Sequence, residues 1–589
     1  MTEGGAAARS SILREYRTLL PYFARYKRRY IAGFICLIIV DGAQILIPQL
    51  IRRALNIMQN VSFVWLEVFK LCVAMTLTML IIAFGRFLWR YFLHGASRQI
   101  EAELREKLFE HLLVMDSAFY QKNKTGDLMA RGANDTTAIR MAIGWGLVGG
   151  VDGTLMAAGI LAVIFFQAPA VAAYTILPVP FITLLIILFG RALGSRFRRA
   201  HEAYSSMSEL VRETFAGVRV IKSFVREETF LEKAKHENAE YVNANMSVVR
   251  LHGLFFPLIL FLAGLTMLIV LWAGGGAVIR GKMRAGDLVS LISYIQMLIW
   301  PMFGAGFTVN MIQRGAISMS RINEVLNAEP EIKDGRTEAG AAAAEACPLI
   351  EIKSLNFAYG GGAHALKNIN LSINEGEWLG IFGRTGAGKS TLIRLLPRIL
   401  DAPPGTVFVN GVDVREWKLA ELRSVFGVAP QDSFLFSDTI ANNIRYGCGD
   451  AAFLPPVVQL AALEKDIAGF KAGFETTIGE RGLTLSGGQK QRVTIARAAI
   501  IEPRVLILDD SLSACDAETE KTILSNLEAA RRGKTTIIIS HRVSAFRQAA
   551  NVAVLEDGVL SEYGTPESLL AAGGYYAKTA RLQQLENPS

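Results

Sequence analysis

The sequence is poor in cysteine and in charge. Its 589 residues include five cysteines with no CxxC pair and no regular spacing, so neither a disulfide framework nor a zinc site is indicated. Only 20% of the residues are charged while 51% are hydrophobic, which is apolar for a soluble chain. The N-terminal charged region is long and no small-residue cleavage site follows it, so we expect no cleaved signal peptide.

A net charge of +9 would suit a nucleic-acid partner. Much of the lysine and arginine, however, lies beside long apolar runs, where basic residues orient a chain in the bilayer. We therefore expect a lipid bilayer as the partner of this chain and no nucleic acid.

The apolar excess lies almost wholly before residue 312. A helix needs about 20 apolar residues to cross the hydrocarbon of a bilayer. Six segments approach that length: 30–50, 64–93, 139–166, 170–190, 252–279 and 288–311. The residues before 30 are amphipathic and end in a basic cluster at 25–29, which predicts a helix on the cytoplasmic membrane surface. This cluster places the N-terminus in the cytoplasm, and six spans return the chain there.

The composition changes after the last apolar run. We expect residues 1–327 to form a transmembrane domain, 328–348 a linker rich in alanine and glycine, and 349–589 a soluble domain. In the soluble part, β-rich runs such as 349–357 and 535–539 alternate with helical stretches. This alternation predicts an α/β domain built around a partly parallel sheet.

A glycine-rich stretch follows the apolar run 378–382 and precedes a helix-like segment. It consists of Gly383, Arg384, Thr385, Gly386, Ala387, Gly388, Lys389 and Ser390, with Thr391 next. Strand, glycine-rich turn and helix in this order are the context of a phosphate-binding P-loop. The glycines let backbone N–H groups face a polyphosphate. Lys389 would reach the outer phosphates and the Ser390 hydroxyl would hold Mg²⁺, so we expect a bound nucleotide.

Four further residues suit the same chemistry. Asp509 ends the apolar strand 505–509, as in a Walker B motif, where its carboxylate would hold Mg²⁺. Gln431 lies in a loop from which it could sense the metal and the γ-phosphate, and His541 follows a strand from which it could contact that phosphate. Tyr359 follows the first strand and could stack on adenine. Taken singly, the tyrosine, glutamine and histidine are weak signals, because such residues usually serve packing or structure.

A second glycine-rich motif lies between the P-loop and Asp509. Leu485 is followed by Ser486, Gly487, Gly488 and Gln489, and then by a helix. The N-terminus of that helix would offer free N–H groups to a second phosphate. An LSGGQ sequence between a P-loop and a Walker B strand is a very specific sequence signal.

Together these motifs resemble the nucleotide-binding domain of the ABC transporter family, over about 349–580. The resemblance implies that two such domains enclose two ATP molecules. Each ATP would be held by the P-loop of one domain and the LSGGQ sequence of the other.

The membrane half resembles the exporter branch of this family, in which six helices precede the ATPase on one polypeptide. Residues 477–482 resemble an exporter-associated loop, and 119–128 and 216–224 resemble the two coupling helices that dock on the ATPase. The resemblance implies half of a transporter in a bacterial-type inner (plasma) membrane. Such a half must dimerise, and its ATPase domain lies in the cytoplasm.

One residue departs from the family pattern. A competent domain carries glutamate after the Walker B aspartate, as the base that orients the attacking water, and this chain has Asp510. Aspartate is shorter by one methylene, roughly 1.5 Å, and a misplacement of about 1 Å can cost about a hundredfold in rate. The run 508–514 resembles one half of heterodimeric multidrug exporters, whose own ATP site is degenerate. Its intact LSGGQ would complete the site of a partner with glutamate. The alternative is a homodimer that hydrolyses slowly with Asp510.

Charged residues occur within the predicted spans. Asp41, Arg86 and Asp152 are expected at membrane depth, where an ionised side chain needs a partner or a wet cavity. They indicate either a pathway for cationic, amphipathic substrates or a structural ion pair. The pattern is also consistent with helix ends that lie nearer to the membrane–water interface than these spans suggest.

The sequence therefore predicts ATP-driven export of hydrophobic or amphipathic small molecules, of multidrug type. A lipid flippase fits the same architecture. A siderophore importer and an ATP-gated channel are further alternatives, although no added regulatory domain is recognisable.

Overall fold

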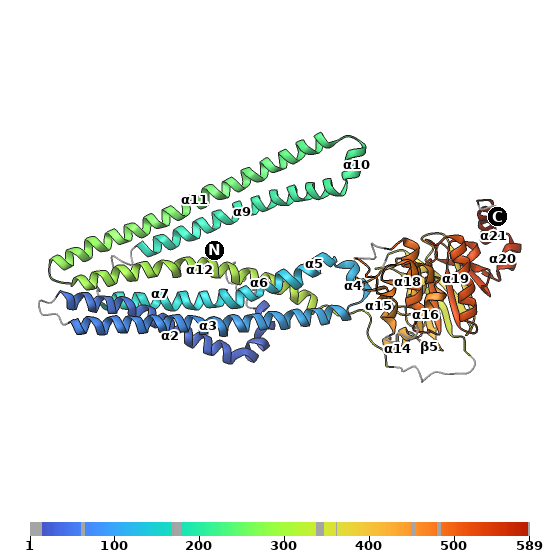
Figure 1. The fold of residues 1–589 in the computed structure, drawn as a ribbon, viewed down its shortest axis with the longest axis horizontal. Coiled ribbons are helices and arrows are strands. Elements are labelled where there is room, and N and C mark those ends of the chain that lie inside the picture. The colour runs from blue at the N-terminus through green and yellow to red at the C-terminus, as the bar shows by residue number, and fades with distance from the viewer. Residues whose placement is uncertain are drawn as a thin grey trace. The chain divides into compact units, whose positions relative to one another are not determined.

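The computed structural model describes residues 14–59, 65–167, 169, 178–336, 347–360, 362–448, 454–479 and 485–586. The described chain divides into two compact units. Residues up to 114 and 124–328 form the first, and residues 115–123 with those from 329 onward form the second. The first unit is helical, whereas every described strand lies in the second (Figure 1).

Long helices make up the first unit. They are α2 (Leu20–Met58), α3 (Trp65–Val114), α7 (Leu147–Gln167), α9 (Pro178–Ala216), α11 (Glu227–Ile279) and α12 (Ala285–Leu326). The shorter elements are η1 (Tyr16–Leu19), α5 (Thr125–Ala130), η2 (Arg131–Asp135), α6 (Thr136–Met141), η3 (Ala142–Gly146) and α10 (Val218–Ser223). The elements η2 and η3 are π-helical turns inside the helical run that ends with α7. Such π-turns are frequent near functional sites.

Four helical runs of the described chain are long and apolar enough to cross a membrane. They are Tyr16–Met58, Trp65–Val114, Thr125–Gln167 and Glu227–Ile279. The predicted number of six is therefore not confirmed. Part of the predicted span 170–190 lies outside the described residues, and the last predicted span, 288–311, lies within α12.

The N-terminal helix differs from the expectation of a separate surface helix before residue 30. Helix α2 runs without a break from Leu20 into the first predicted span. The reason is local, because Pro21 lies in the first turn, where proline is tolerated, and no further proline occurs before Pro48.

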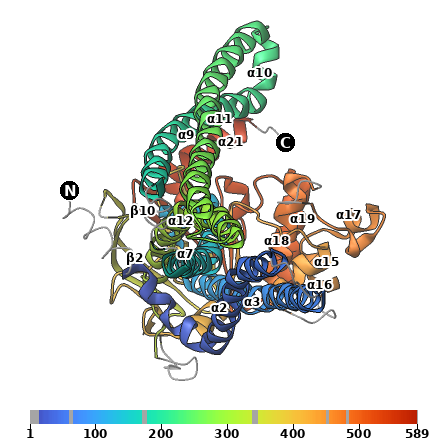
Figure 2. The same ribbon diagram turned by 90° about the vertical axis from the view of Figure 1, so that its left-hand side faces the viewer.

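Helices α9 and α11 form a hairpin that α10 closes. Figures 1 and 2 both show this hairpin diverging from the other helices of its unit. The predicted second coupling segment, 216–224, contains α10. Five large apolar side chains near the tip are exposed: Phe215, Val218, Val220, Phe224 and Val225. An exposed apolar patch of this kind marks an interaction surface.

The predicted first coupling segment contains the short helix α4 (Ser117–Lys122). The Asp116 carboxylate caps this helix by accepting the Phe119 N–H at 3.0 Å. Its other oxygen accepts the Glu331 N–H at 2.6 Å, and Lys122 lies 3.3 Å from the Glu331 carboxylate. Because of such contacts, α4 belongs to the second unit rather than to the helical one.

The second unit contains two sheets. The larger has the order β10-β9-β3-β8-β7-β6, with β10 antiparallel to β9 and the other neighbours parallel. The smaller is antiparallel and has the order β2-β1-β4-β5. Their strands are β1 (Ile350–Ala358), β2 (His364–Ile373), β3 (Trp378–Gly383), β4 (Val407–Val409), β5 (Val412–Asp413), β6 (Phe426–Ala429), β7 (Val505–Asp509), β8 (Thr535–Ile539), β9 (Asn551–Glu556) and β10 (Val559–Gly564).

Helices connect these strands. They are α13 (Lys389–Leu395), α14 (Leu419–Ser424), α15 (Ile440–Ile444), α16 (Leu454–Leu460), α17 (Glu464–Gly469), α18 (Gly487–Ala499), α19 (Ala517–Ala530), α20 (Pro566–Ala572) and α21 (Tyr575–Glu586), with short 3₁₀ turns η4 (Arg445–Gly447), η6 (Gly473–Glu475) and η8 (Val543–Phe546).

The central strands β7 and β8 are buried along their whole length, as expected for parallel strands covered on both faces. Alternate residues enter different cores: Leu506 and Leu508 pack on one face, and Val505 and Ile507 on the other. Because β3, β6, β7 and β8 are parallel, their carboxyl ends share one edge of the sheet. Ligands of α/β sheets bind at such an edge.

Candidate ATP site

The predicted P-loop connects β3 to α13 at the carboxyl edge of the sheet. Gly386 and Gly388 have φ angles of 85° and 96°, which glycine adopts without steric penalty. The buried Lys389 ammonium group donates hydrogen bonds to the carbonyl oxygens of Gly383 at 2.7 Å and Arg384 at 2.8 Å. Burial lowers the pKa of Lys389, and the nearby carboxylates of Asp510 and Asp509 oppose this effect. The Lys389 ammonium group therefore lies against the backbone of the loop that would bind the phosphates.

Ser390 and Asp509 meet although 119 residues separate them in the chain. The Ser390 hydroxyl donates to the Asp509 carboxylate at 3.1 Å. Burial raises the pKa of Asp509, whereas the hydrogen bond from Ser390 acts in the opposite direction. Two adjacent oxygen ligands of this kind suit Mg²⁺. Among the described residues, no group of three or more His, Cys, Asp or Glu could hold a metal by itself, so Mg²⁺ here would also need phosphate oxygens.

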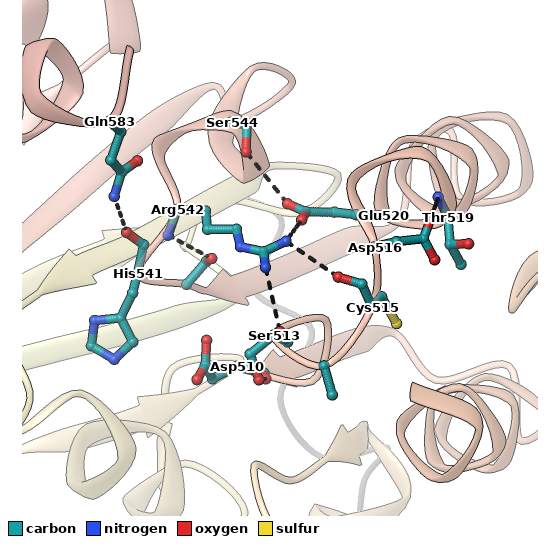
Figure 3. A network of polar contacts seen from close by, with 12 residues as sticks. Asp510, Ser513, Cys515, Asp516, Thr519, Glu520, His541, Arg542, Ser544 and Gln583 are labelled. Carbon is teal, nitrogen blue, oxygen red and sulfur yellow. Dashed lines mark hydrogen bonds and ion pairs between the residues drawn. The ribbon is translucent and has the colours of Figure 1, made fainter. Parts of the chain in front are cut away.

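Asp510 directly follows β7 in a left-handed conformation, with φ of 48°. Its N–H donates to the Ile539 carbonyl oxygen at 3.0 Å, which ties it to the end of β8. Figure 3 shows the His541 ring beside the Asp510 carboxyl group. Burial raises the pKa of Asp510, and the charges of His541 and Lys389 oppose this effect. The structure thus brings Asp510 and His541 together.

The other two predicted residues, Gln431 and Tyr359, lie at the margin of the carboxyl edge of the larger sheet. Gln431 is exposed two residues beyond β6, whose neighbour β7 ends in Asp509. The Tyr359 hydroxyl lies 2.9 Å from the Thr391 hydroxyl, so the tyrosine is held against the start of α13. With 42% of its surface exposed, Tyr359 retains a face for an aromatic ligand.

The predicted LSGGQ sequence forms the N-terminus of α18. Ser486 is the N-cap: its hydroxyl accepts the Gln489 N–H at 3.2 Å, and the Gln489 side chain accepts the Ser486 N–H at 2.9 Å. This capping box defines where the helix begins. Of the predicted exporter-associated loop, residues 480–482 lie outside the described residues.

A cavity of about 350 Å³ opens at the LSGGQ sequence. It is lined by Ser486, Gly487, Gly488, Arg492, Ala514, Cys515, Asp516 and Thr519. None of these described lining residues belongs to the P-loop of the same chain. The two phosphate-binding motifs of one chain therefore do not share this cavity.

Sequence reasoning missed Gln583, which lies on the C-terminal helix α21. Its side-chain N–H donates to the His541 carbonyl oxygen at 2.6 Å, and its side-chain oxygen accepts the Val543 N–H at 2.9 Å (Figure 3). One amide therefore holds the backbone on both sides of Arg542. No motif marks a glutamine 42 residues after the histidine that it supports.

Sequence reasoning also missed Arg542. Its guanidinium group pairs with the Glu520 carboxylate and donates to the carbonyl oxygens of Ser513 and Cys515, both at 3.4 Å (Figure 3). The segment that follows Asp510 is thus attached to the segment that carries His541.

We expect Gln583→Ala to accelerate hydrogen exchange at the Val543 amide. A hydrogen bond of this kind contributes about 0.5–1.5 kcal/mol, so the exchange rate should rise by roughly twofold to tenfold. Hydrogen–deuterium exchange with mass spectrometry on a peptide that spans 541–547 measures this effect. Gln584→Ala, the exposed neighbour on α21, is the matched control. Equal exchange in both variants would contradict the assigned contact.

Comparisons with known proteins agree with this architecture. The model of the ABC transporter transmembrane region matches residues 30–302, and the ABC transporter model matches residues 366–513. A probable multidrug resistance ABC transporter ATP-binding/permease protein, YheI of Bacillus subtilis, is 37% identical, covering 96% of this chain and 97% of the relative. The ATP-dependent lipid A-core flippase of Syntrophus aciditrophicus is 30% identical, covering 97% and 95%. A solved structure of a bacterial Atm1-family ABC exporter with ATP bound is 25% identical, with a TM-score of 0.78, covering 94% of this chain and 99% of that one.

The chain belongs to the ABC transporter family. It is a membrane protein in which a helical exporter-type domain is followed by the ABC ATPase domain on one polypeptide. The ATPase domain binds ATP and hydrolyses it in coupled transport.

Proposed function

We propose that this chain is one half of a dimeric exporter, which uses ATP to move hydrophobic or amphipathic small molecules outward across the bacterial inner membrane. The observation that carries the proposal is the Ser390–Asp509 contact in a chain that also has membrane-length helices. The multidrug-type name of the Bacillus relative supports the substrate class. The basic cluster at 25–29 supports a cytoplasmic N-terminus and a cytoplasmic ATPase domain.

In this proposal, residues 383–391 bind the phosphates and Tyr359 stacks on adenine. Ser390, Asp509 and Gln431 would hold Mg²⁺, which would supply positive charge against the phosphates. The LSGGQ residues Ser486–Gln489 contact the ATP of the partner subunit. The separate cavity beside Ser486 supports this arrangement, because no residue of the chain's own P-loop lines it.

We further propose that the partner is a different half-transporter, with glutamate in place of Asp510. The short Asp510 side chain follows the strand end, and its N–H is already bonded to Ile539, which limits how far its carboxylate can advance. His541 beside it would contact the γ-phosphate. The ATP site on this chain is then the slow one, and the site completed by its LSGGQ sequence is the fast one.

Helices α4 and α10 are proposed to carry the coupling between ATP binding and the membrane helices. The contacts of Asp116 and Lys122 with Glu331 support this role for α4, because they join it to the ATPase-bearing unit. The exposed apolar tip around α10 supports a contact with the second subunit.

We expect inverted membrane vesicles that contain the complex to accumulate a fluorescent amphiphile when ATP is added. A non-hydrolysable ATP analogue should support no accumulation, because transport requires turnover. Fluorescence of the dye inside the vesicles measures the uptake. ATP-dependent loss of dye from inverted vesicles would indicate an importer, and ATP-gated single-channel current would indicate a channel. Either result would overturn the proposal.

A lipid flippase is the second candidate, favoured by the name of the Syntrophus relative. A flippase would move a fluorescent lipid between leaflets in proteoliposomes, which dithionite quenching detects. Faster ATP-dependent movement of lipid than of dye would favour this candidate.

A further inference from the structure

A cavity of about 900 Å³ lies between helices α2, α3, α7 and α12 of the membrane unit. This volume is within the range of pockets for drug-sized molecules, about 300–1,000 Å³. Its wall is largely apolar and includes Trp89, Trp145, Met156 and Phe307. The π-helical turn η3 carries Trp145, and Pro301 interrupts the hydrogen bonding of α12 at the same cavity.

Two carboxyl groups from different helices face this cavity. Asp41 on α2 and Asp152 on α7 both line it, and their side chains interact with each other. Asp41 is only 4% exposed, and its side-chain contact is with a second acid, Asp152. Burying two acidic groups beside each other is costly unless a positive charge or a proton compensates them. A buried acid aimed into a cavity therefore calls for a positive ligand.

The charge of Arg86 acts on both acids, but neither arginine of the cavity contacts them directly. Arg86 is exposed and donates to the Gln44 side chain at 3.0 Å, and Arg90 lies over the Trp89 ring at 5.5 Å. Neither forms an ion pair with Asp41 or Asp152 in the described structure. The structural ion pair considered from the sequence is thus absent among the described residues.

We propose that this cavity binds an amphipathic organic cation, with its positive charge against Asp41 and Asp152 and its apolar body against the aromatic wall. The proposal rests on the exporter function above and names its substrate class. Electrostatic attraction to the carboxylates would act on the charge, while the apolar wall would contact the body of the ligand. Arg86 and Arg90 already contact Gln44 and Trp89. A ligand with an anionic head group would therefore gain less binding free energy in this cavity than a cation would.

The test compares tetraphenylphosphonium, a bulky cation, with uncharged triphenylphosphine oxide. Binding is measured by equilibrium dialysis on the complex purified through a tag on this chain. We expect Asp41→Asn and Asp152→Asn each to weaken tetraphenylphosphonium binding by at least about tenfold, the size of a charge-assisted contact. Binding of the uncharged compound should change far less, because Asn keeps the shape of the side chain. Glu67→Gln, an exposed acid paired with Lys70, is the matched control and should change neither.

Two outcomes would overturn this proposal. Unchanged tetraphenylphosphonium binding in both variants would mean that a shared proton satisfies the acid pair. Failure of both variants to assemble, with normal assembly of Glu67→Gln, would mean that the acids are structural. The vesicle assay separates this result from the exporter proposal, because wild-type uptake of dye does not depend on where a cation binds.

Discussion

In the purified complex, Ser486→Arg is expected to lower steady-state ATPase activity by roughly a hundredfold or more, whereas Asp510→Asn should leave most of it. Removing one preorganised hydrogen-bond donor from a developing negative charge can cost about 10²–10³ in rate, and the N–H groups at this helix start are donors of that kind. Arginine at position 486 would place a bulky cation where the partner's ATP meets these groups. Asp510 lies in the ATP site of this chain's own P-loop, which we propose to be the slow one. Removing its charge should therefore lower the ATPase activity of the complex only slightly.

The opposite pattern would identify a homodimer. There Asp510 is the only base available, and losing a general base costs about 10²–10⁴-fold. A loss in Asp510→Asn comparable to that in Ser486→Arg would therefore overturn the heterodimer. Mass spectrometry of the purified complex provides an independent check, because a second half-transporter with glutamate after its Walker B aspartate should be present.

Ser486→Arg also removes a helix cap, which costs about 1 kcal/mol. Its folding must therefore be verified, and nucleotide binding at the chain's own P-loop serves this purpose. The LSGGQ cavity contains no P-loop residue, so that binding should be retained. Lost binding would indicate a folding defect rather than a blocked phosphate contact.

Lys389→Ala is expected to weaken nucleotide binding at this chain's own site by roughly tenfold to a hundredfold. A hydrogen bond to a charged group contributes about 1.5–3 kcal/mol, and each 1.4 kcal/mol corresponds to about tenfold in affinity. The Lys389 ammonium group lies on the loop carbonyl oxygens of Gly383 and Arg384, from which it can turn to the outer phosphates. Its removal takes away the ammonium group that would contact these phosphates.

The measurement is nucleotide affinity in a complex whose partner P-loop has been disabled, so that only one site is observed. Lys534→Ala is a suitable control, because this lysine is exposed and pairs with Glu502. Unchanged affinity in Lys389→Ala would show that the assignment of the phosphate site is wrong.

The sequence alone determined the local features of this protein. The order of strand, glycine-rich turn and helix at 378–395 is visible in the chain and is formed as expected. The start of α18 at Ser486 and the two short segments containing α4 and α10 were also readable. Such features depend on backbone hydrogen bonding and periodicity within a few residues. One helix boundary was wrong, because the amphipathic N-terminal segment and the first span share an uninterrupted helical pattern from Leu20.

Contacts between distant residues were decided by the tertiary structure. Parallel strand order brings Ser390 to Asp509. The fold also places Gln583 against the His541 backbone and buries Asp41 beside Asp152 at a cavity. A sequence gives the type of each side chain, but whether a carboxylate finds a cation depends on how all surrounding helices pack. Burial and pairing are properties of the packed chain, so local pattern alone could not distinguish an ion pair from an open site.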